Sequence, residues 1–416
     1  MKNTIKAIIL IICAALLALV IIKRPKDSTP AEMPAPVQSA EPTPAPTPEP
    51  APTPTPTPAP DFDDTPQETD MAVTVNGMEL SGVFKLNGVE YIKLYELLAA
   101  VKPGAQPELI NDVSDHYAVN ASCGNIGVYC ENNSIDIYVG EYGSVMNANP
   151  WVLYASPLYD GVDWYVPLDA CEALGYTRYD DAEMNHVYYT FIPTPEMVPA
   201  GRRVPVLMYH AISDECWGLE GLFVSPSEMD KQLQYLEDNG YTTIWFEDLP
   251  YIDQIEKPVI LTFDDGYDDN YTELFPLLKK HNAKATIFVV TSRMGTGRFM
   301  TAEQAREMSE SGLVSIQSHT SSHRELKWLD AAELDAELSL SVLEVTRITG
   351  KQPFVVCYPS GKYSDLAVEK VEEYFTFGTI IDGYTYVTGE CRRGAIPRLR
   401  IPREMTVSGF AWTVDN

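Results

Sequence analysis

Two short groups of acidic and histidine side chains have the residue types of a metal site. The apolar run Val259–Phe263 ends in Asp264 and Asp265, which places two adjacent carboxylates after a predicted strand. Two acids at such a position are costly unless a cation holds them. A second apolar run leads directly into His319 and His323, and their spacing of four residues lets both imidazoles face one point on a single helical turn.

One aspartate and two histidines make an open set of ligands for a divalent ion. Such a set leaves coordination positions for water and for a substrate oxygen, as a hydrolytic zinc site requires. Taken alone, paired aspartates are common in turns, and two histidines at this spacing also occur on solvated helices. The joint position of the two groups after predicted strands favours a metal. We expect zinc, with cobalt or nickel as alternatives.

The elements that must position these groups alternate between predicted strands and helices from residue 200 onwards. Capping-box pairs mark helix starts at Ser225 with Glu228, Thr301 with Gln304, and Asp330 with Glu333. The predicted strands are Val204–Tyr209, Val259–Phe263, Ala285–Val290, Val314–Ile316, Phe354–Tyr358 and Phe377–Ile381. This order predicts an α/β barrel, in which functional side chains follow the carboxyl ends of the strands.

Two segments of this region resemble motifs of a known family. Thr262–Gly266 and His319–His323 are similar to the first and second motifs of the polysaccharide deacetylase family, also called the NodB-homology domain or carbohydrate esterase family 4. The resemblance extends from Val204 to the C-terminus, and it implies a distorted (β/α) barrel for residues 200–416. The implied activity is the hydrolysis of acetyl groups on a polysaccharide.

The resemblance also implies a role for each motif residue. Asp264 is then the general base that takes a proton from the attacking water. The implied metal ligands are Asp265, His319 and His323.

The third motif of the family, Arg-x-Pro-x-Gly, departs from its pattern because Cys357 stands in the position of the arginine. In the family that arginine orients the base, and a backbone N–H of the following loop helps to hold the oxyanion. Arg398 or Arg400 is the expected replacement for the missing cation. The residues expected to form the oxyanion wall are Tyr358, Pro359, Ser360 and Gly361.

A histidine near the start of the barrel completes the expected site. Family members usually carry a late histidine as general acid, but no histidine follows His323 in this chain. The segment Pro205–His210 is similar to a permuted subgroup that includes poly-N-acetylglucosamine deacetylases. His210 is then the acid that protonates the leaving amine, and the alternative is an ordinary buried histidine at a strand end.

The N-terminal segments predict an exported, tethered protein. Lys2 and Lys6 precede the apolar run Ala7–Ile22, so residues 1–27 are expected to form an uncleaved membrane anchor, with a cleaved signal peptide and secretion as the alternative. Residues 28–70 are rich in Thr-Pro and Ala-Pro repeats and are expected to form an unfolded, extended spacer on the extracellular side.

Residues 71–192 predict a small strand-rich α+β domain. Short strand-like runs separated by turn residues recur there. The segment Asp163–Leu168 and the residues that follow it resemble the copper amine oxidase N-terminal-like stalk domain, a name that does not imply copper. Outside the cell, Cys123 and Cys130 are the favoured disulfide pair, and burial of the cysteines as small apolar residues is the alternative.

The charge composition of the chain limits the classes of partner that it can bind. The chain carries 59 acidic and 30 basic side chains, a formal charge of −29, which opposes nucleic acids and anionic lipid surfaces. The expected function is removal of N-acetyl groups from an N-acetylglucosamine polymer, which is peptidoglycan, an exopolysaccharide or a chitin-like glycan. The alternatives are an O-acetyl esterase and, because Cys357 replaces the motif arginine, a non-catalytic wall-bound carbohydrate-binding protein.

Overall fold

The computed structural model describes residues 65–111, 118–123, 126–131, 134–139, 151–160 and 162–416. The predicted anchor and nearly all of the predicted spacer therefore lie outside the described residues. Within the part of the chain that is described, no helix combines the length and the apolar character needed to cross a bilayer.

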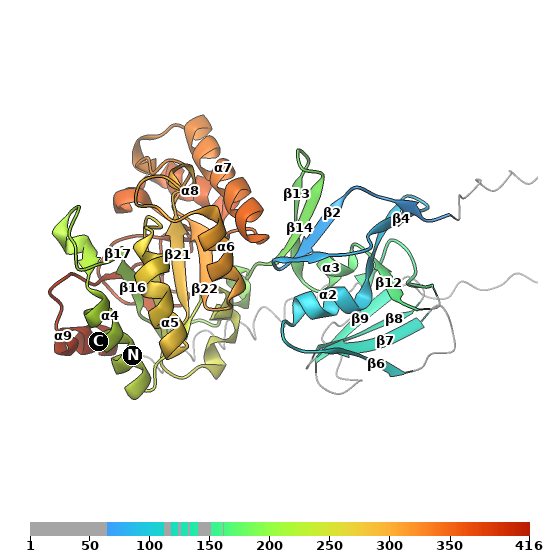
Figure 1. Cartoon of the computed structure of the whole chain (residues 1–416), viewed down its shortest axis with the longest axis horizontal. Coiled ribbons are helices and arrows are strands. Elements are labelled where there is room, and N and C mark those ends of the chain that lie inside the picture. The colour runs from blue at the N-terminus through green and yellow to red at the C-terminus, as the bar shows by residue number, and fades with distance from the viewer. Residues whose placement is uncertain (1–64, 112–117, 124–125, 132–133, 140–150, 161) are drawn as a thin grey trace, which may run out of the picture. The chain divides into compact units, whose positions relative to one another are not determined.

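Residues 65–192 are built mainly from short strands (Figure 1). Three sheets have the strand orders β1-β4-β5-β12-β11, β10-β9-β8-β7-β6 and β13-β14-β2-β3. The helices are α2 (Leu94–Val101) and α3 (Ala170–Ala173). The strands are β1 (Gln67–Glu68), β2 (Ala72–Val75), β3 (Met78–Leu80), β4 (Phe84–Leu86), β5 (Val89–Lys93), β6 (Pro107–Asn111), β7 (Ala118–Cys123), β8 (Ile126–Glu131), β9 (Ser134–Val139), β10 (Trp151–Val152), β11 (Leu158–Tyr159), β12 (Trp164–Pro167), β13 (Tyr176–Asp181) and β14 (His186–Phe191).

The strand-rich character predicted for this region is confirmed, but the favoured cysteine pair is wrong. The hydrogen-bonded register of β7 and β8 places Cys130 opposite Val119 and Cys123 opposite Ile126. The two cysteines are thus offset by four residues along the strands, roughly 13 Å at ~3.3 Å per residue, and a disulfide requires Cα atoms within ~7 Å. The likeness of residues 71–192 to the copper amine oxidase N-terminal-like domain stays a prediction.

The second region contains a sheet with the order β24-β23-β22-β21-β20-β16-β26, and β19 also pairs with β20. Every pairing in this sheet is parallel. Its strands are β16 (Val206–Tyr209), β19 (Thr242–Ile244), β20 (Pro258–Phe263), β21 (Ala285–Val289), β22 (Val314–Ser318), β23 (Val355–Cys357), β24 (Phe377–Thr379) and β26 (Leu399–Arg400). Short strands beside it are β15 (Arg203–Val204), β17 (Ala211–Ile212), β18 (Phe223–Val224) and β25 (Tyr386–Val387).

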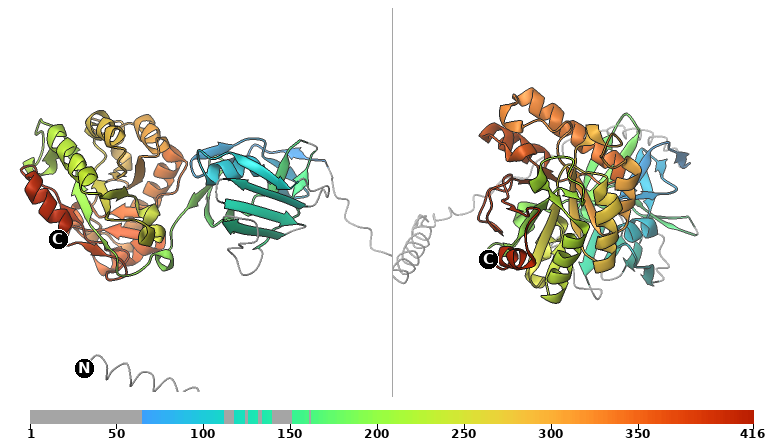
Figure 2. Two further views of the ribbon diagram at one scale, coloured as in Figure 1. Left: turned by 90° about the horizontal axis from the view of Figure 1, so that it is seen from below. Right: turned by 60° about the vertical axis from the view of Figure 1, so that its left-hand side comes forward.

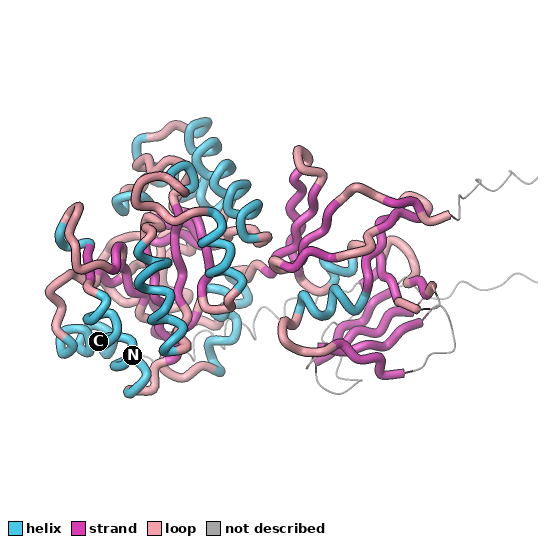
Figure 3. Tube along the Cα trace, viewed as in Figure 1, coloured by secondary structure: helices cyan, strands magenta, loops and turns pink. Residues whose placement is uncertain are grey.

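Helices cover this sheet and alternate with its strands along the chain (Figures 2 and 3). They are α4 (Pro226–Asp238), α5 (Phe275–His281), α6 (Ala302–Glu310), α7 (Ala331–Thr349), α8 (Asp365–Tyr374) and α9 (Val407–Asp415). The Ser225, Thr301 and Asp330 side chains each accept a hydrogen bond from the third residue of their helix, which confirms the three helix starts. Both bonds of the expected capping box form at Thr301 and at Asp330. The result is the distorted (β/α) barrel expected for residues 200–416.

The alternation of side chains along β20 determines which way the site residues point. Val259, Leu261 and Phe263 pack in the core beneath α4, α5 and α6, whereas Ile260 belongs to a second core on the other face of the sheet. Because successive side chains of a strand point to opposite faces, Asp264 continues the face of Ile260 and points into the barrel.

Candidate active site

Asp264 and Asp265 follow β20 directly and point in different directions from a strained turn. The N–H of Asp264 still donates to the carbonyl of Tyr209, at 3.0 Å, so this residue extends the strand. Asp265 has φ of +75°, which is unusual for a residue with a side chain. Gly266 has the same φ, and a Cβ atom there would lie 2.9 Å from Val289 Cγ1. The turn thus brings both carboxylates to the same end of the sheet, and backbone strain of this kind concentrates at functional sites.

His319 and His323 follow β22, the second strand away from β20 in the sheet. The predicted helical turn is wrong, because residues 319–325 form a loop in which Thr320 has φ of +67° and His323 has φ of +64°. The loop nevertheless brings the two imidazole rings to a centroid distance of 4.9 Å. The convergence expected from the motif is therefore reached by a different backbone conformation.

Glu337 of α7 holds this loop in place. Its carboxylate accepts hydrogen bonds from the N–H and the hydroxyl of Ser322, and its carbonyl accepts from the N–H of Ser321. The hydroxyl of Thr320 accepts from the N–H of His323 at 3.1 Å. No sequence argument singled out Glu337, because an acidic residue within a long helix has no pattern that distinguishes it from a solvated one.

Asp265, His319 and His323 form a group whose ligand atoms all lie within 4.8 Å of one another. Asp265 Oδ1 is 3.6 Å from His319 Nε2 and 3.3 Å from His323 Nε2. His319 Nδ1 donates to the carbonyl of Cys357 at 2.8 Å, so Nε2 of the neutral ring carries its lone pair toward the carboxylate. Two electron-rich atoms facing each other at this distance fit a cation between them, and a backbone carbonyl that orients a ligating histidine is typical of metal sites.

Burial and nearby charges tune these groups in opposite directions. Burial lowers the pKa of His319 to about 4 and outweighs the raising effect of Asp264 and Asp265, so the ring is neutral at pH 7. Burial alone would raise the pKa of Asp265, but a hydrogen bond with His323 and the proximity of His319 lower it overall. A neutral imidazole and an ionised carboxylate are the protonation states that bind a divalent ion.

Asp264 is held by an ion pair with Arg398. The guanidinium donates from both terminal nitrogens to the two carboxylate oxygens, at 2.6 and 2.7 Å, and both side chains are buried. Arg398 also donates to the hydroxyl of Thr262 at 3.0 Å and lies 3.0 Å from Cys357 Sγ. The guanidinium thus fixes both oxygens of the expected base.

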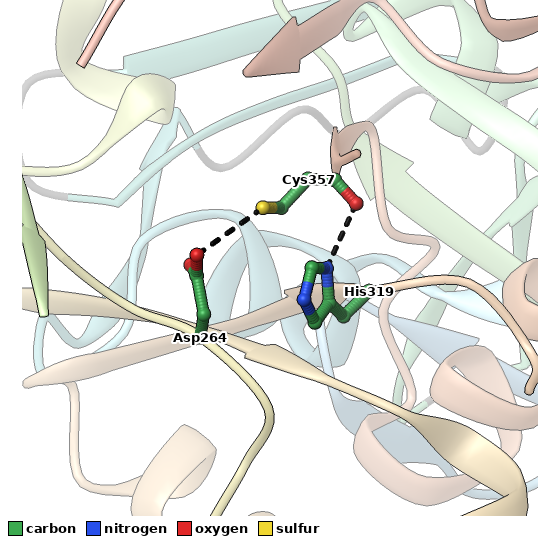
Figure 4. Close-up of side chains that lie close together, drawn as sticks. All are labelled: Asp264, His319 and Cys357. Atoms are coloured by element: carbon green, nitrogen blue, oxygen red, sulfur yellow. Dashed lines mark hydrogen bonds between the residues drawn. The ribbon is translucent and has the colours of Figure 1, made fainter. Parts of the chain in front are cut away.

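Figure 4 shows how Cys357 lies between Asp264 and His319. Its thiol is 3.5 Å from Asp264 Oδ2, while its carbonyl accepts the hydrogen bond from His319. The small thiol leaves room for Arg398, which reaches Asp264 from the segment before β26. The cation that the third motif lacks is therefore present, but it comes from the segment before β26.

The pKa of Asp264 reflects this pairing. Burial would raise it, but the charge and hydrogen bonds of Arg398, with smaller contributions from His210 and His319, lower it to about 2. Arg400, the other expected replacement, is exposed on β26, and its Nη2 lies 3.7 Å from where a Cβ of Gly221 would stand. The structure therefore brings Arg398 to the base and leaves Arg400 outside the ion pair.

His210 follows β16 directly. This strand lies on the other side of β20 from β22, which precedes His319 and His323. The Nε2 atom of His210 is 3.8 Å from Asp264 Oδ2, and its side chain is 13% exposed. Burial lowers the pKa of His210 and outweighs the raising effect of Asp264 and Asp265. His210, which precedes both motifs in the sequence, is thus next to Asp264 in the fold.

The expected oxyanion wall forms a tight turn after β23. Tyr358 donates its N–H to the carbonyl of Thr379, and Gly361 donates to the carbonyl of Tyr358. Pro359 has no N–H, so the N–H of Ser360, a residue with φ of +56°, is the remaining donor of the wall.

The chain is similar to known proteins. A family model described as polysaccharide deacetylase matches residues 252–375. YxkH of Bacillus subtilis (strain 168), named as a polysaccharide deacetylase, is 35% identical over 223 residues, which cover 51% of this chain and 77% of that protein. The poly-beta-1,6-N-acetyl-D-glucosamine N-deacetylase of Escherichia coli (strain K12) is 25% identical over 254 residues, which cover 49% of this chain and 37% of that protein.

A solved structure agrees with these matches. The crystal structure of BC0361, a polysaccharide deacetylase from Bacillus cereus, is 25% identical with a TM-score of 0.50, and the match covers 74% of this chain and 99% of that chain. One family assignment follows from the two motifs, the parallel barrel and the share of YxkH that the match covers. The chain belongs to the polysaccharide deacetylase family.

Proposed function

We propose that the protein is a divalent-metal-dependent N-deacetylase that acts on an N-acetylglucosamine-containing polysaccharide at the cell surface. The observation that carries the proposal is the convergence of three ligand side chains, Asp265, His319 and His323, beside a base that is held by a buried guanidinium. A carbohydrate-binding protein without activity would not need the pair formed by Asp264 and Arg398.

The residues divide the work of hydrolysis. A divalent ion held by Asp265, His319 and His323, with zinc favoured by the nitrogen and oxygen ligands, would polarise the acetyl carbonyl and lower the pKa of water. Asp264 accepts the proton of the attacking water, and Arg398 keeps its carboxylate ionised and oriented. The N–H of Ser360 is the proposed hydrogen-bond donor to the developing oxyanion.

The position of His210 favours an amide over an ester. When the C–N bond of an amide breaks, the nitrogen must take up a proton before the amine leaves, whereas an ester oxygen leaves more easily without one. His210 Nε2 lies 3.8 Å from Asp264 Oδ2, so the proposed acid and the proposed base stand side by side and can act on the same acetamide. The acid is therefore expected to matter most for N-acetyl groups.

The relatives and the N-terminal sequence support the substrate class and location. The Escherichia coli relative is named as a deacetylase of a β-linked N-acetylglucosamine polymer. The apolar run near the N-terminus and the proline-rich segment after it suit a protein tethered to the outer face of the membrane that reaches a glycan some distance away.

Acetate release from N-acetylglucosamine oligomers tests the proposal. The purified full-length protein is assayed after chelation and again after zinc, cobalt or nickel is restored. We expect activity to disappear and to return with metal, and Asp264→Asn to lower kcat by about 10²–10⁴-fold. Asp268→Asn changes a nearby carboxylate that belongs neither to the group formed by Asp265, His319 and His323 nor to the Asp264–Arg398 ion pair, and it should keep activity within a few fold.

One result of this assay would contradict the proposed function. Stoichiometric metal binding without acetate release from any N-acetylated oligomer would overturn the N-deacetylase. Release from O-acetylated polysaccharides in the same preparation would then establish the esterase alternative.

A further inference from the structure

Behind His210 lie two adjacent polar side chains that the reaction described above does not use. Asn270 is fully buried, and Asp269 is 7% exposed. They stand at the start of a single π-helical turn, Asn270–Leu274, which leads into α5. Turns of this type inside helices are rare and are found frequently at functional sites.

Both side chains hydrogen-bond to the backbone that carries His210. Asn270 Nδ2 donates to the carbonyl of His210 at 2.9 Å. Asp269 Oδ1 accepts from the N–H of Ile212 at 3.1 Å and from Asn270 Nδ2 at 2.9 Å. The backbone is thus held on both sides of Ala211, and the pair forms one connected network.

The rest of this segment is fixed by the sheet. Tyr209 accepts from the N–H of Asp264 at 3.0 Å, and the N–H of Ser213 donates to the carbonyl of Val224 at 2.9 Å. Between these two points β17 pairs with β18 along Ala211 and Ile212. Among the described residues, the Asp269–Asn270 pair adds the side-chain bonds to the His210 and Ile212 backbone, and Asn270 is the partner of the His210 carbonyl. The orientation of His210 toward Asp264 therefore depends on this pair together with the β17–β18 pairing.

The arrangement is costly for the fold. Asp269 Oδ2 and Asn270 Oδ1 are buried and have no hydrogen-bond partner among the described residues. A buried polar atom without a partner costs about 1–3 kcal/mol. Burial also raises the pKa of Asp269 to about 6, a sign that its carboxylate is poorly solvated. Unpaired buried groups of this kind call for a specific explanation.

We propose that Asp269 and Asn270 are positioning residues for His210, which hold its backbone so that the imidazole stays in reach of the leaving nitrogen. The inference rests on the proposed function, since it assigns a role in amide hydrolysis. A displacement of about 1 Å of a reacting group can cost ~10²-fold in rate. The pair therefore acts through His210 and does not touch substrate.

The chemistry of the leaving group separates positioning from stability. When an acetamide is cleaved, the C–N bond breaks and the nitrogen takes a proton from the acid. When p-nitrophenyl acetate is cleaved, p-nitrophenolate leaves with the bonding electrons and needs no proton. The ratio of amide to activated-ester hydrolysis thus reports on the acid, while a loss of metal, base or folded protein lowers both rates together.

Two substitutions of nearly equal shape at adjacent positions give opposite expectations. Asn270→Asp removes the donor to the His210 carbonyl, and we expect the amide-to-ester ratio to fall about tenfold to a hundredfold. Asp269→Asn keeps an oxygen that can accept from Ile212, and we expect the ratio to stay within about threefold of the wild type. Asp269→Ala removes that acceptor and should lower the ratio, which provides a second test should Asn270→Asp not fold.

Two controls complete the experiment. Thr346→Val removes a buried hydrogen bond within α7, from Thr346 Oγ1 to the carbonyl of Val342, and should not change the ratio. His210→Asn should lower the ratio at least as much as Asn270→Asp, and adding Asn270→Asp to it should lower the ratio no further, because both act on one proton transfer.

The outcomes separate this inference from the proposed function. Equal losses of amide and ester hydrolysis in both Asn270→Asp and Asp269→Ala would overturn the positioning role and leave a structural one. An additive fall in the double variant would overturn it as well. A wild-type protein that cleaves the activated ester but no N-acetylated oligomer contradicts the proposed function itself.

Discussion

The proposed metal ligands and the proposed acid and base lie at the same end of one sheet, but they are assembled in different ways. The proposed ligands Asp265, His319 and His323 come from two short motifs, each directly after a strand. The base is instead held by Arg398, a residue 134 positions further along the chain. Ligands are recognisable locally because their own atoms do the work, whereas the groups that hold a base can come from any element whose end reaches it.

The largest expected effect comes from breaking the distant partner of the base. Arg398→Ala leaves the buried carboxylate of Asp264 without its cation, so we expect a loss of about 3–5 kcal/mol in the free energy of unfolding. Amide hydrolysis should fall at least a hundredfold, which is the order of a misplaced base. Urea unfolding and acetate release measure the two effects, and wild-type values in both would show that Asp264 does not depend on Arg398.

A second substitution sharpens the same comparison. Cys357→Arg added to Arg398→Ala places a guanidinium where the family motif has one, and we expect about tenfold more activity than in Arg398→Ala alone. Cys357→Arg in the wild-type background is the control. It should lower activity, because two guanidinium groups then compete for one buried carboxylate.

A smaller effect is expected from the turn that orients Asp265, a proposed metal ligand. Gly266→Ala introduces a Cβ 2.9 Å from Val289 Cγ1 and 3.2 Å from Val289 Cα, at a φ of +75°. We expect a loss of about 1–3 kcal/mol in stability and weaker metal binding, because Asp265 precedes this residue. Gly312→Ala, at a φ of +74° with nothing within 4 Å, is the matched control. Equal losses in the two variants would mean that the contact with Val289 carries no cost.

Asp269, which bonds to the backbone next to His210, should make the free energy of unfolding depend on pH. Asp269 has a folded-state pKa raised from 3.8 to about 6, chiefly by burial, so the folded state holds the proton more tightly than the unfolded state. Its stabilising contribution is complete below the unfolded pKa, declines as the pH rises, and is lost above the folded pKa of about 6. At ~1.4 kcal/mol per pH unit the change is at most ~3 kcal/mol.

Asp269→Asn isolates this contribution. Denaturant unfolding of wild type and variant is measured between pH 4 and pH 7, and the variant should become relatively more stable across that window. A constant difference would mean that Asp269 does not titrate there.

The smallest effect is expected at the arginine that lies outside the ion pair. Arg400→Ala removes an exposed side chain, so stability should change by less than about 0.5 kcal/mol and turnover by less than about threefold. A loss as large as that of Arg398→Ala would show that exposure on β26 does not exclude a role in holding the base.

Much of this molecule follows from short-range pattern. Apolar runs bounded by capping boxes determine the strands and helices of the barrel, because burial and backbone hydrogen bonding act over a few residues. The rule that parallel strands place their carboxyl ends together then predicts that Asp264 and His319 meet. The residues proposed as ligands and base can therefore be picked out before the fold is known.

The remainder was decided only by tertiary structure. The loop at His319–His323 is not a helical turn, because Glu337 of α7 holds its backbone in a conformation that no local pattern encodes. Arg398 and Arg400 are equivalent by type and spacing, and only the path of the chain before β26 buries one and exposes the other. Sequence by itself determined which atoms can react, since that is a property of residue type. Which atoms hold them depends on distances between segments far apart in the chain, and packing alone sets those distances.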